Sequence, residues 1–222
     1  MLKIDMHVHT WYSDSTASVN EVLEVARRKG LDGVAITDHH TLLGAYEAQR
    51  ISRGLIIIPG EEIKTKRGEI LALGLTRPVP KYLPINEALR RIHLQGGLAI
   101  IPHPTLPFFS KLKAKDLMHL PIDGLEAISA ATPLPQHYLK KNLELAKNLG
   151  LIITAGSDSH FPETVGDAYT LVNSKTRKLD DILHAIKQGR TAIRGELSGV
   201  NFQLRILIGM LWHLLEYSFN RD

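Results

Sequence analysis

The sequence contains no cysteine, so this chain has neither disulfides nor thiolate metal ligands, and nitrogen and oxygen atoms would have to hold any bound metal. It also lacks the basic segment and long apolar run of a signal peptide, because a strand pattern begins at the N-terminus. We therefore expect a cytoplasmic protein.

Three common catalytic motifs are missing as well. The chain has no Gly-x-Ser-x-Gly elbow, no P-loop and no Gly-x-Gly-x-x-Gly, so serine acyl transfer and a glycine-rich phosphate cradle have no motif here. With 44% hydrophobic and 23% charged residues, the composition is that of a globular protein. The net charge of +4 suits an anionic substrate but falls short of a nucleic-acid-binding stripe.

Apolar, β-rich runs alternate with helical patterns along most of the chain. A strand over 2–8 is followed by a helix that Ser18 and Glu21 open with a capping box and that Gly30 ends. Further strands are predicted at 33–37, 55–58, 70–74, 98–101, 125–128, 151–154, 168–172 and 191–193, and further helices at 42–53, 85–95, 136–149 and 179–189. This order indicates a parallel sheet covered by helices, and 222 residues suit one α/β barrel.

Residues that bind metals follow most of these strands. His7 and His9 should share one face of the first strand, where two imidazoles can hold one metal with Asp5 as an orienting carboxylate. Such a strand also occurs with two ordinary polar histidines. Later strands end at Asp38-His39-His40, Glu61-Glu62, His103, and Asp158 with His160. Because barrel strands converge at their C-terminal ends, we expect one shared pocket.

With these motifs the sequence resembles the PHP (polymerase and histidinol phosphatase) family of metal-dependent phosphoesterases. The family motifs Asp-x-His-x-His, Thr-Asp-His, Gly-x-Glu, Pro-His-Pro and Ser-Asp-x-His stand in order at 5–9, 37–39, 60–62, 102–104 and 157–160. The resemblance covers about residues 1–195 and implies a distorted (β/α)7 TIM-like barrel in a single domain. It also implies phosphoester hydrolysis by a metal-bridging hydroxide in a di- or trinuclear site.

The resemblance further implies two or three divalent ions, chosen from manganese, zinc, iron and magnesium. The first would be held by His7, His9, Glu62 and Asp158, the second by Glu62 and His103, and the third by Asp14, His39 and His160. Asp14 is also a plausible plain turn residue. The Gly-x-Glu spacing selects Glu62, so that Glu61 should point away.

Three more residues are candidates for this site. Many relatives carry a histidine where this chain has Glu69, and a carboxylate ligand there would shift the preference from zinc toward harder ions. The alternative is an exposed strand-edge glutamate that binds nothing. His40, beside a presumed ligand, and His137, at a predicted helix start, are candidates for protonating the leaving group or binding phosphate. Either is equally compatible with a surface histidine.

The substrate class stays open between a phosphorylated small molecule and a nucleotide or oligonucleotide end. Aromatic residues beside the motifs would favour nucleotides if they stack on bases. They are Trp11, Tyr12, Phe108, Phe109 and Phe161. Competing hypotheses are an amidohydrolase and a non-catalytic PHP scaffold in a nucleic-acid-processing complex, and a metal analysis separates the scaffold from the enzyme.

Residues 196–222 form a strongly apolar tail with a helical pattern. Its charge-free part is too short for a transmembrane helix, which needs about 20 predominantly apolar residues. We rank packing on the barrel, or a homo-oligomer formed through this tail, ahead of membrane attachment.

Overall fold

The computed structural model describes residues 1–106, 112–132, 135–196, 198, 199 and 202. In this part of the chain one sheet has the strand order β7-β6-β5-β4-β3-β2-β1-β8-β9. The strands are β1 (Leu2–Val8), β2 (Gly33–Ile36), β3 (Ile56–Thr65), β4 (Gly68–Leu73), β5 (Leu98–Ile101), β6 (Gly124–Ser129), β7 (Ile152–Gly156), β8 (Ala168–Val172) and β9 (Thr191–Gly195). The predicted α/β barrel is confirmed.

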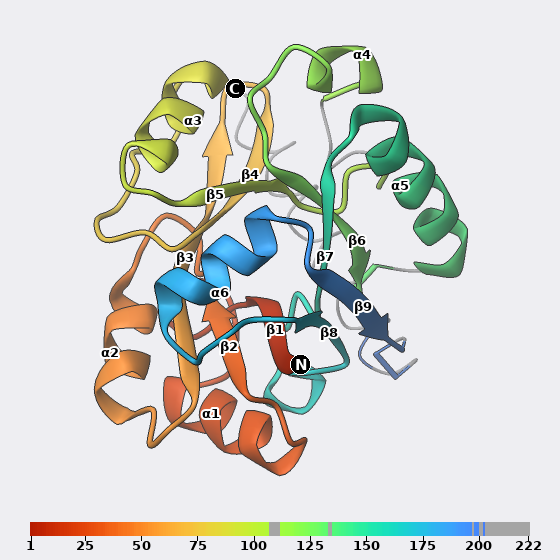
Figure 1. Ribbon diagram of the computed structural model, residues 1–222. Helices are drawn as coiled ribbons and strands as arrows, with labels where there is room; N and C mark the ends of the chain where they lie inside the picture. The colour runs from red at the N-terminus through yellow and green to blue at the C-terminus, as the bar shows by residue number, and fades with distance from the viewer. Residues whose placement is uncertain (107–111, 133–134, 197, 200–201, 203–222) are drawn as a thin grey trace, which may run out of the picture.

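The sheet curls until β7, at one end of the strand order, comes back to β1 (Figure 1). Just beyond β7, Ser159 forms a parallel bridge with Val8 of β1. The His9 N–H donates to the Ser159 carbonyl at 3.1 Å, and the Asp158 N–H donates to the His7 carbonyl at 2.8 Å. These bonds make the barrel nearly closed, and they join the first and last metal-binding motifs of the sequence.

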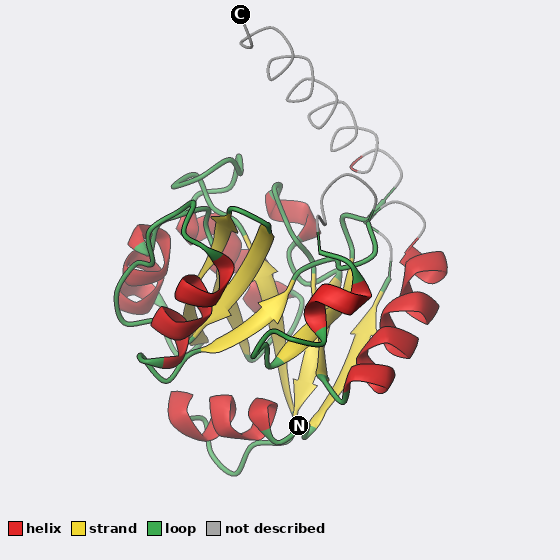
Figure 2. Ribbon diagram, turned by 90° about the horizontal axis from the view of Figure 1, so that it is seen from above, coloured by secondary structure: helices red, strands yellow, loops and turns green. Residues whose placement is uncertain are grey.

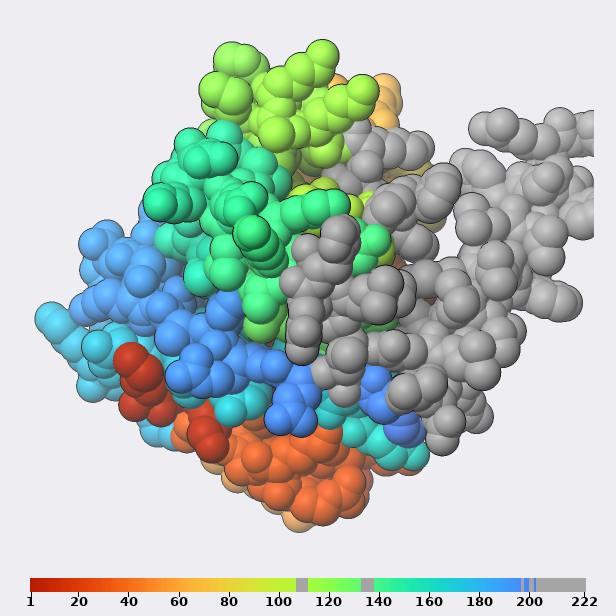
Figure 3. Space-filling model, turned by 90° about the vertical axis from the view of Figure 1, so that its right-hand side faces the viewer, coloured from red at the N-terminus to blue at the C-terminus, as the bar shows by residue number. Residues whose placement is uncertain are grey.

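Helices cover the outer side of this curved wall (Figure 2). They are α1 (Val19–Arg28), α2 (Leu43–Ile51), α3 (Ile85–His93), α4 (Ala114–Leu117) and α5 (Pro135–Leu149). The remaining helix, α6 (Leu179–Lys187), packs at one end of the barrel, and Pro162–Thr164 form a short 3-10 helix. The predicted capping box of Ser18 and Glu21 opens α1. Figure 3 shows one flank, where α4 and α5 in green lie above α1 in orange.

The expectation of a parallel sheet is wrong at two strands. β4 runs antiparallel to β3 and β5, and β8 runs antiparallel to β1 and β9. Only Lys66 and Arg67 join β3 to β4, which is far too short for the crossover that parallel strands need. Because β4 is reversed, its first residues, Gly68 and Glu69, lie at the rim where β3 ends.

Two apolar clusters fill the space on either side of the sheet. One packs α1, α2 and α3 against the outer faces of the strands. The other contains Ile4, Ile58, Leu71 and Ile100 of four strands together with Ile182 of α6. In Figure 1, α6 lies across the end of the barrel nearest the viewer. The apolar interior is therefore closed at that end, and polar side chains gather at the opposite rim.

Strict alternation fails within β1. Met6 packs in the inner cluster while Val8 packs in the outer one, and the pairing with β2 is irregular between Asp5 and Val8. Asp5 consequently contacts backbone rather than imidazole rings, which corrects its expected role. Its carboxylate accepts hydrogen bonds from the Ser157 N–H at 2.8 Å and the Gly166 N–H at 2.8 Å. Asp5 thus holds the end of β7 against β1.

None of the helices among the described residues is long and apolar enough to cross a membrane. The predicted helical tail falls almost wholly on residues outside that description.

Candidate metal centre

The metal-binding side chains predicted from the motifs lie together at one rim of the barrel. They come from β1 and the turn after it, from the ends of β2, β3, β5 and β7, and from the start of β4. Within three groups, one donor atom per side chain lies within 4.8 Å of the others. The groups are His7, His9 and Glu62; Glu62, Glu69 and His103; and His9, Asp14, His39 and His160.

Glu62 connects the first two groups. Its Oε2 lies 3.3 Å from the Nε2 atoms of His7 and His9, and its Oε1 lies 3.4 Å from Nε2 of His103. Oδ1 of Asp158 lies 3.5 Å from Nε2 of His7 and 3.4 Å from Nε2 of His9. Imidazole nitrogens and carboxylate oxygens that converge in this way form a donor set suited to divalent transition metals. The residues present therefore fit the ions that the motifs imply.

The third group surrounds Asp14. Its Oδ2 lies 3.4 Å from Nε2 of His39 and 3.3 Å from Nε2 of His160, and its Oδ1 lies 3.7 Å from Nδ1 of His9. Asp14 does stand in a turn, yet its carboxylate faces three histidines. Its side chain is 41% exposed, which leaves this side of the centre open to solvent.

Glu126 of β6 is a buried carboxylate that the sequence motifs did not reveal. Its Oε1 lies 3.0 Å from Nδ1 of His7, and its Oε2 accepts a hydrogen bond from the His103 N–H at 3.0 Å. One carboxylate therefore orients a side chain of the first group and the backbone of the second. A charged residue within the apolar run of a predicted strand was the only signal for it.

Asp38 supports the turn that carries Asp14. Its carboxylate accepts hydrogen bonds from the Thr10 N–H at 2.6 Å, the Thr10 hydroxyl at 2.7 Å and the Ser13 hydroxyl at 2.8 Å. The Thr-Asp-His motif thus contributes its aspartate to the position of the turn and its histidine to the third group.

Three residues of the centre have left-handed backbone conformations. The φ angles are 58° at His40, 29° at His103 and 53° at Asp158. Such angles are uncommon for residues other than glycine, and they cluster at functional sites because the surrounding structure has to hold them. Two of the three are held by hydrogen bonds, from the His103 N–H to Oε2 of Glu126 and from the Asp158 N–H to the His7 carbonyl.

The buried acidic and imidazole side chains of the centre shift one another's pKa values. Burial would lower the pKa of His103, but the hydrogen bond and charge of Glu62 outweigh it and raise this pKa to about 9. At His160 burial is likewise outweighed, by Asp14 and Asp158, and the pKa again rises to about 9. Burial and then the charge of Glu62 raise the pKa of Glu69. Bound cations would replace these protons as partners of the carboxylates.

Glu61 points away from the histidines, as the motif spacing predicted. It is fully buried, and its Oε2 accepts a hydrogen bond from the Val79 N–H at 2.9 Å. The side chain of Glu62 therefore faces the histidines, and that of the adjacent Glu61 faces the backbone at Val79.

Of the two catalytic candidates, the structure describes the side chain of His40 only. The His40 ring is part-buried, and its centroid lies 5.9 Å from that of His39. Burial, followed by the charges of His39 and Lys81, lowers the pKa of His40 to about 4. His137 belongs to α5, but its side chain lies outside the described part of the structure.

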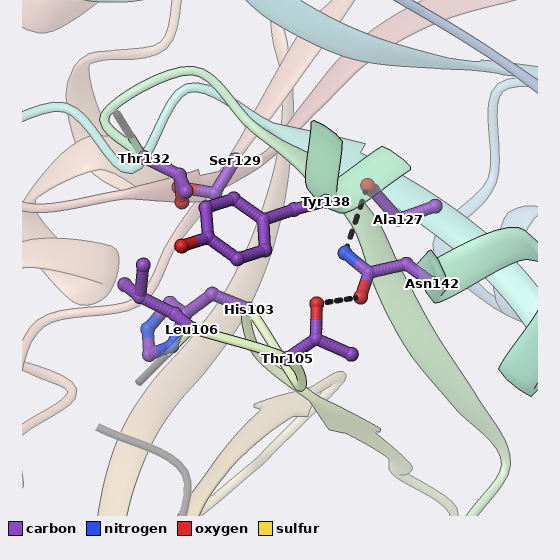
Figure 4. A pocket seen from close by; sticks show the side chains of 8 residues that line it. All are labelled: His103, Thr105, Leu106, Ala127, Ser129, Thr132, Tyr138 and Asn142. Carbon is purple, nitrogen blue, oxygen red and sulfur yellow. Dashed lines mark hydrogen bonds between the residues drawn. The ribbon is translucent and has the colours of Figure 1, made fainter. Parts of the chain in front are cut away.

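A cavity of about 10 Å³ beside His103 has room for about one water molecule (Figure 4). The Thr105 hydroxyl donates to Oδ1 of Asn142 at 2.6 Å, and the Asn142 amide donates to the Ala127 carbonyl at 3.2 Å. In Figure 4 the hydroxyl end of Tyr138 points to the side where the His103 ring lies. These bonds tie α5 to β6 and to the segment that carries His103.

Comparison with known proteins assigns the family. A family model described as PHP-associated matches residues 136–191. A protein from Methanocaldococcus jannaschii is 38% identical over 142 residues, which cover 58% of this chain and 82% of that protein. The chain belongs to the PHP family.

This PHP protein is also similar to an enzyme in sequence and to a solved structure in fold. The 5'-3' exoribonuclease of Haemophilus influenzae is 26% identical over 151 residues, covering 65% of this chain and 52% of that enzyme. The crystal structure of a two-domain protein from Bacteroides vulgatus, containing a predicted PHP-like metal-dependent phosphoesterase, superposes with a TM-score of 0.75. That match covers 94% of this chain and 69% of the other at 22% identity, and it supports the fold.

Glu69 stands where the resemblance to the PHP family implied a histidine. It is partly buried rather than exposed, and it shares a donor group with Glu62 and His103. The position of the carboxylate is thus compatible with a metal ligand.

Proposed function

We propose that this PHP protein is a metal-dependent phosphoester hydrolase. The observation that carries the proposal is the position of Glu62, whose two carboxylate oxygens face two different donor groups at 3.3 and 3.4 Å. A carboxylate so placed can bridge two cations. The similarity to an exoribonuclease, and the fold shared with a predicted PHP-like metal-dependent phosphoesterase, support the same reaction class.

Nine side chains would hold two or three divalent ions. The first ion would be bound by His7, His9, Glu62 and Asp158, the second by Glu62, Glu69 and His103, and the third by Asp14, His39 and His160. Bound ions of this kind supply an activated water and neutralise the charge of the phosphoryl oxygens. The oxygen donor at Glu69 favours manganese, iron or magnesium over zinc at the second position.

The protein itself would supply position and polarity. Glu126 holds Nδ1 of His7, so that Nε2 faces the centre. His40 and His137 remain our candidates for contacting the phosphate or protonating the leaving group. Because its pKa is lowered to about 4, the His40 ring is neutral at pH 7 and would serve as a contact for the phosphate rather than as the acid. We propose a phosphorylated small molecule or a nucleotide or oligonucleotide end as the substrate, residues 1–195 as the hydrolase unit, and residues 196–222 as an apolar helical tail.

Adjacent glutamates provide a matched test. The metal-free protein is reloaded with manganese or zinc and assayed on p-nitrophenyl phosphate and bis(p-nitrophenyl) phosphate. Glu62→Gln should abolish hydrolysis, whereas Glu61→Gln, one residue away and facing Val79, should retain it. His9→Ala and Asp158→Ala should also be inactive. Undiminished activity of Glu62→Gln would refute the proposed centre.

A further inference from the structure

An exposed aromatic side chain stands at the edge of the metal centre. Tyr82 is 53% exposed, and its ring centroid lies 6.5 Å from that of His40. The His40 ring is in turn 5.9 Å from the ring of His39, a candidate ligand. Tyr82 is therefore separated from the centre by a single imidazole, and none of the proposed metal positions uses it.

The backbone of Tyr82 is held in an unusual conformation. Its φ angle is 60°, in the left-handed region that bulky residues seldom adopt. The Tyr82 N–H donates to the Lys64 carbonyl at 2.7 Å, and the Lys66 N–H donates to the Leu83 carbonyl at 3.1 Å. These bonds tie the segment to β3 just beyond Glu62. An exposed ring gains little from burial, so its fixed and strained position points to a functional use.

Two lysines accompany this ring. Nζ of Lys81 lies 5.6 Å from the centroid of Tyr82, and Lys64 is exposed on β3, opposite Glu69 in the ladder. The backbone hydrogen bond from the Tyr82 N–H to the Lys64 carbonyl places both lysines on the two chain segments that meet at this ring. Neither forms an ion pair with a carboxylate within the described residues. The edge of the centre thus combines a flat aromatic face with two ammonium groups that form no close ion pair among the described residues.

We propose that Tyr82, Lys64 and Lys81 form a nucleotide subsite, in which a base beside the scissile phosphate stacks on Tyr82 and a neighbouring phosphate contacts the two lysines. The proposal rests on the proposed function, because it places the scissile phosphate at the metal centre. Among the substrates named in the proposed function, the subsite favours a single-stranded oligonucleotide.

An aromatic ring beside two ammonium groups favours some of the candidate phosphoester substrates over others. Aromatic side chains that stack on bases, together with cations that follow the backbone, are the usual means of binding single strands. A phosphorylated sugar would use the lysines and leave the ring without a partner. A duplex keeps its bases stacked on one another, so Tyr82 would have no free base to contact. A single strand offers an unpaired base and a neighbouring phosphate together, which are the groups that these three side chains would contact.

Binding is measured by fluorescence anisotropy with a labelled single-stranded oligonucleotide, on the metal-free and the manganese-loaded protein. Tyr82→Ala should weaken binding on the order of tenfold, and Tyr82→Trp should retain it. Tyr46→Ala is the matched control, because Tyr46 is 39% exposed on α2 and its hydroxyl donates to the Thr76 carbonyl. This control should bind as the wild type does.

Lys64→Ala and Lys81→Ala should each weaken binding and reduce its dependence on salt concentration, because each removes one phosphate contact. Lys175→Ala is the control for charge. Lys175 is exposed beyond the end of β8, and that end pairs with the start of β1 at the opposite rim. If Tyr82→Ala fails to fold, as judged by circular dichroism, Lys81→Glu provides the same test and should nearly abolish binding.

Binding of a strand without bases separates the contribution of stacking on Tyr82 from that of the phosphate contacts. On an abasic strand with the same number of phosphates, wild type and Tyr82→Ala should bind equally. Failure of the wild type to bind the oligonucleotide, unchanged binding by Tyr82→Ala, or an equal loss on the abasic strand would overturn the subsite. Because binding is read without turnover, a protein that binds in this way but hydrolyses no phosphoester would refute the proposed function and leave the subsite standing.

Discussion

Oε1 of Glu126 lies 3.0 Å from Nδ1 of His7, and both side chains are fully buried. The ring can then present Nε2 to the centre in one fixed orientation. We expect Glu126→Ala to lower metal affinity by roughly 10- to 100-fold, as loss of an orienting carboxylate usually does. Isothermal titration with manganese measures the change. Wild-type affinity in a folded Glu126→Ala protein would contradict this role.

The identity of residue 69 should set the metal preference. Glu69→His replaces an oxygen donor with an imidazole nitrogen, which suits zinc better than manganese or magnesium. After dialysis against equal concentrations of zinc and manganese, the bound zinc-to-manganese ratio of the variant should exceed that of the wild type. An unchanged ratio would show that Glu69 binds no metal.

The third metal position should be separable from the other two. Oδ2 of Asp14 lies 3.4 Å from His39 and 3.3 Å from His160. Its contact with the first group is a longer one, 3.7 Å from Oδ1 to Nδ1 of His9, whose Nε2 faces Glu62. Asp14→Asn should therefore lower the metal content by about one ion per chain while the first two positions stay filled. Elemental analysis provides the count, and loss of all ions would mean that the three groups do not fill independently.

Glu61 should make stability depend on pH in the metal-free protein. Burial raises the pKa of Glu61 from 4.5 to about 7, so between these values the folded state binds more protons than the unfolded one. The contribution of this group to stability is thus full below pH 4.5 and is lost as the pH rises through 7. Glu61→Gln should leave stability unchanged at pH 4 and raise it by about 3 kcal/mol at pH 8.

Urea unfolding in EDTA at both pH values measures this difference. The exposed Glu144→Gln serves as the control and should change nothing at either pH. A Glu61→Gln protein that is stabilised equally at pH 4 and pH 8 would show that proton binding by Glu61 is not the cause.

The sequence predicted the candidate metal ligands better than it predicted the residues that surround them. Histidines and carboxylates after successive apolar strands identify a shared rim, because the barrel converges there. Glu126 and Tyr82 carry no comparable pattern, since one lies within an apolar strand and the other in a loop. Their positions follow from contacts between distant segments, such as Glu126 with His7 and Tyr82 with Lys64.

The directions of β4 and β8 could not be predicted from the local sequence pattern either. A run of alternating strands and helices favours a parallel sheet, but the short link at Lys66 and Arg67 reverses β4. This reversal matters for the centre because it brings Glu69 to the rim beside Glu62. Likewise, the irregular pairing of β1 removes Asp5 from the imidazole rings, which alternation alone would have placed together.

The number of metal ions per chain tests the central claim most directly. After dialysis against manganese and removal of loosely bound ions, the wild type should hold two or three ions, and Glu62→Gln, which loses the bridging carboxylate, should hold at most one. A wild type that binds fewer than one ion, or a Glu62→Gln protein that binds as many as the wild type, would contradict the account.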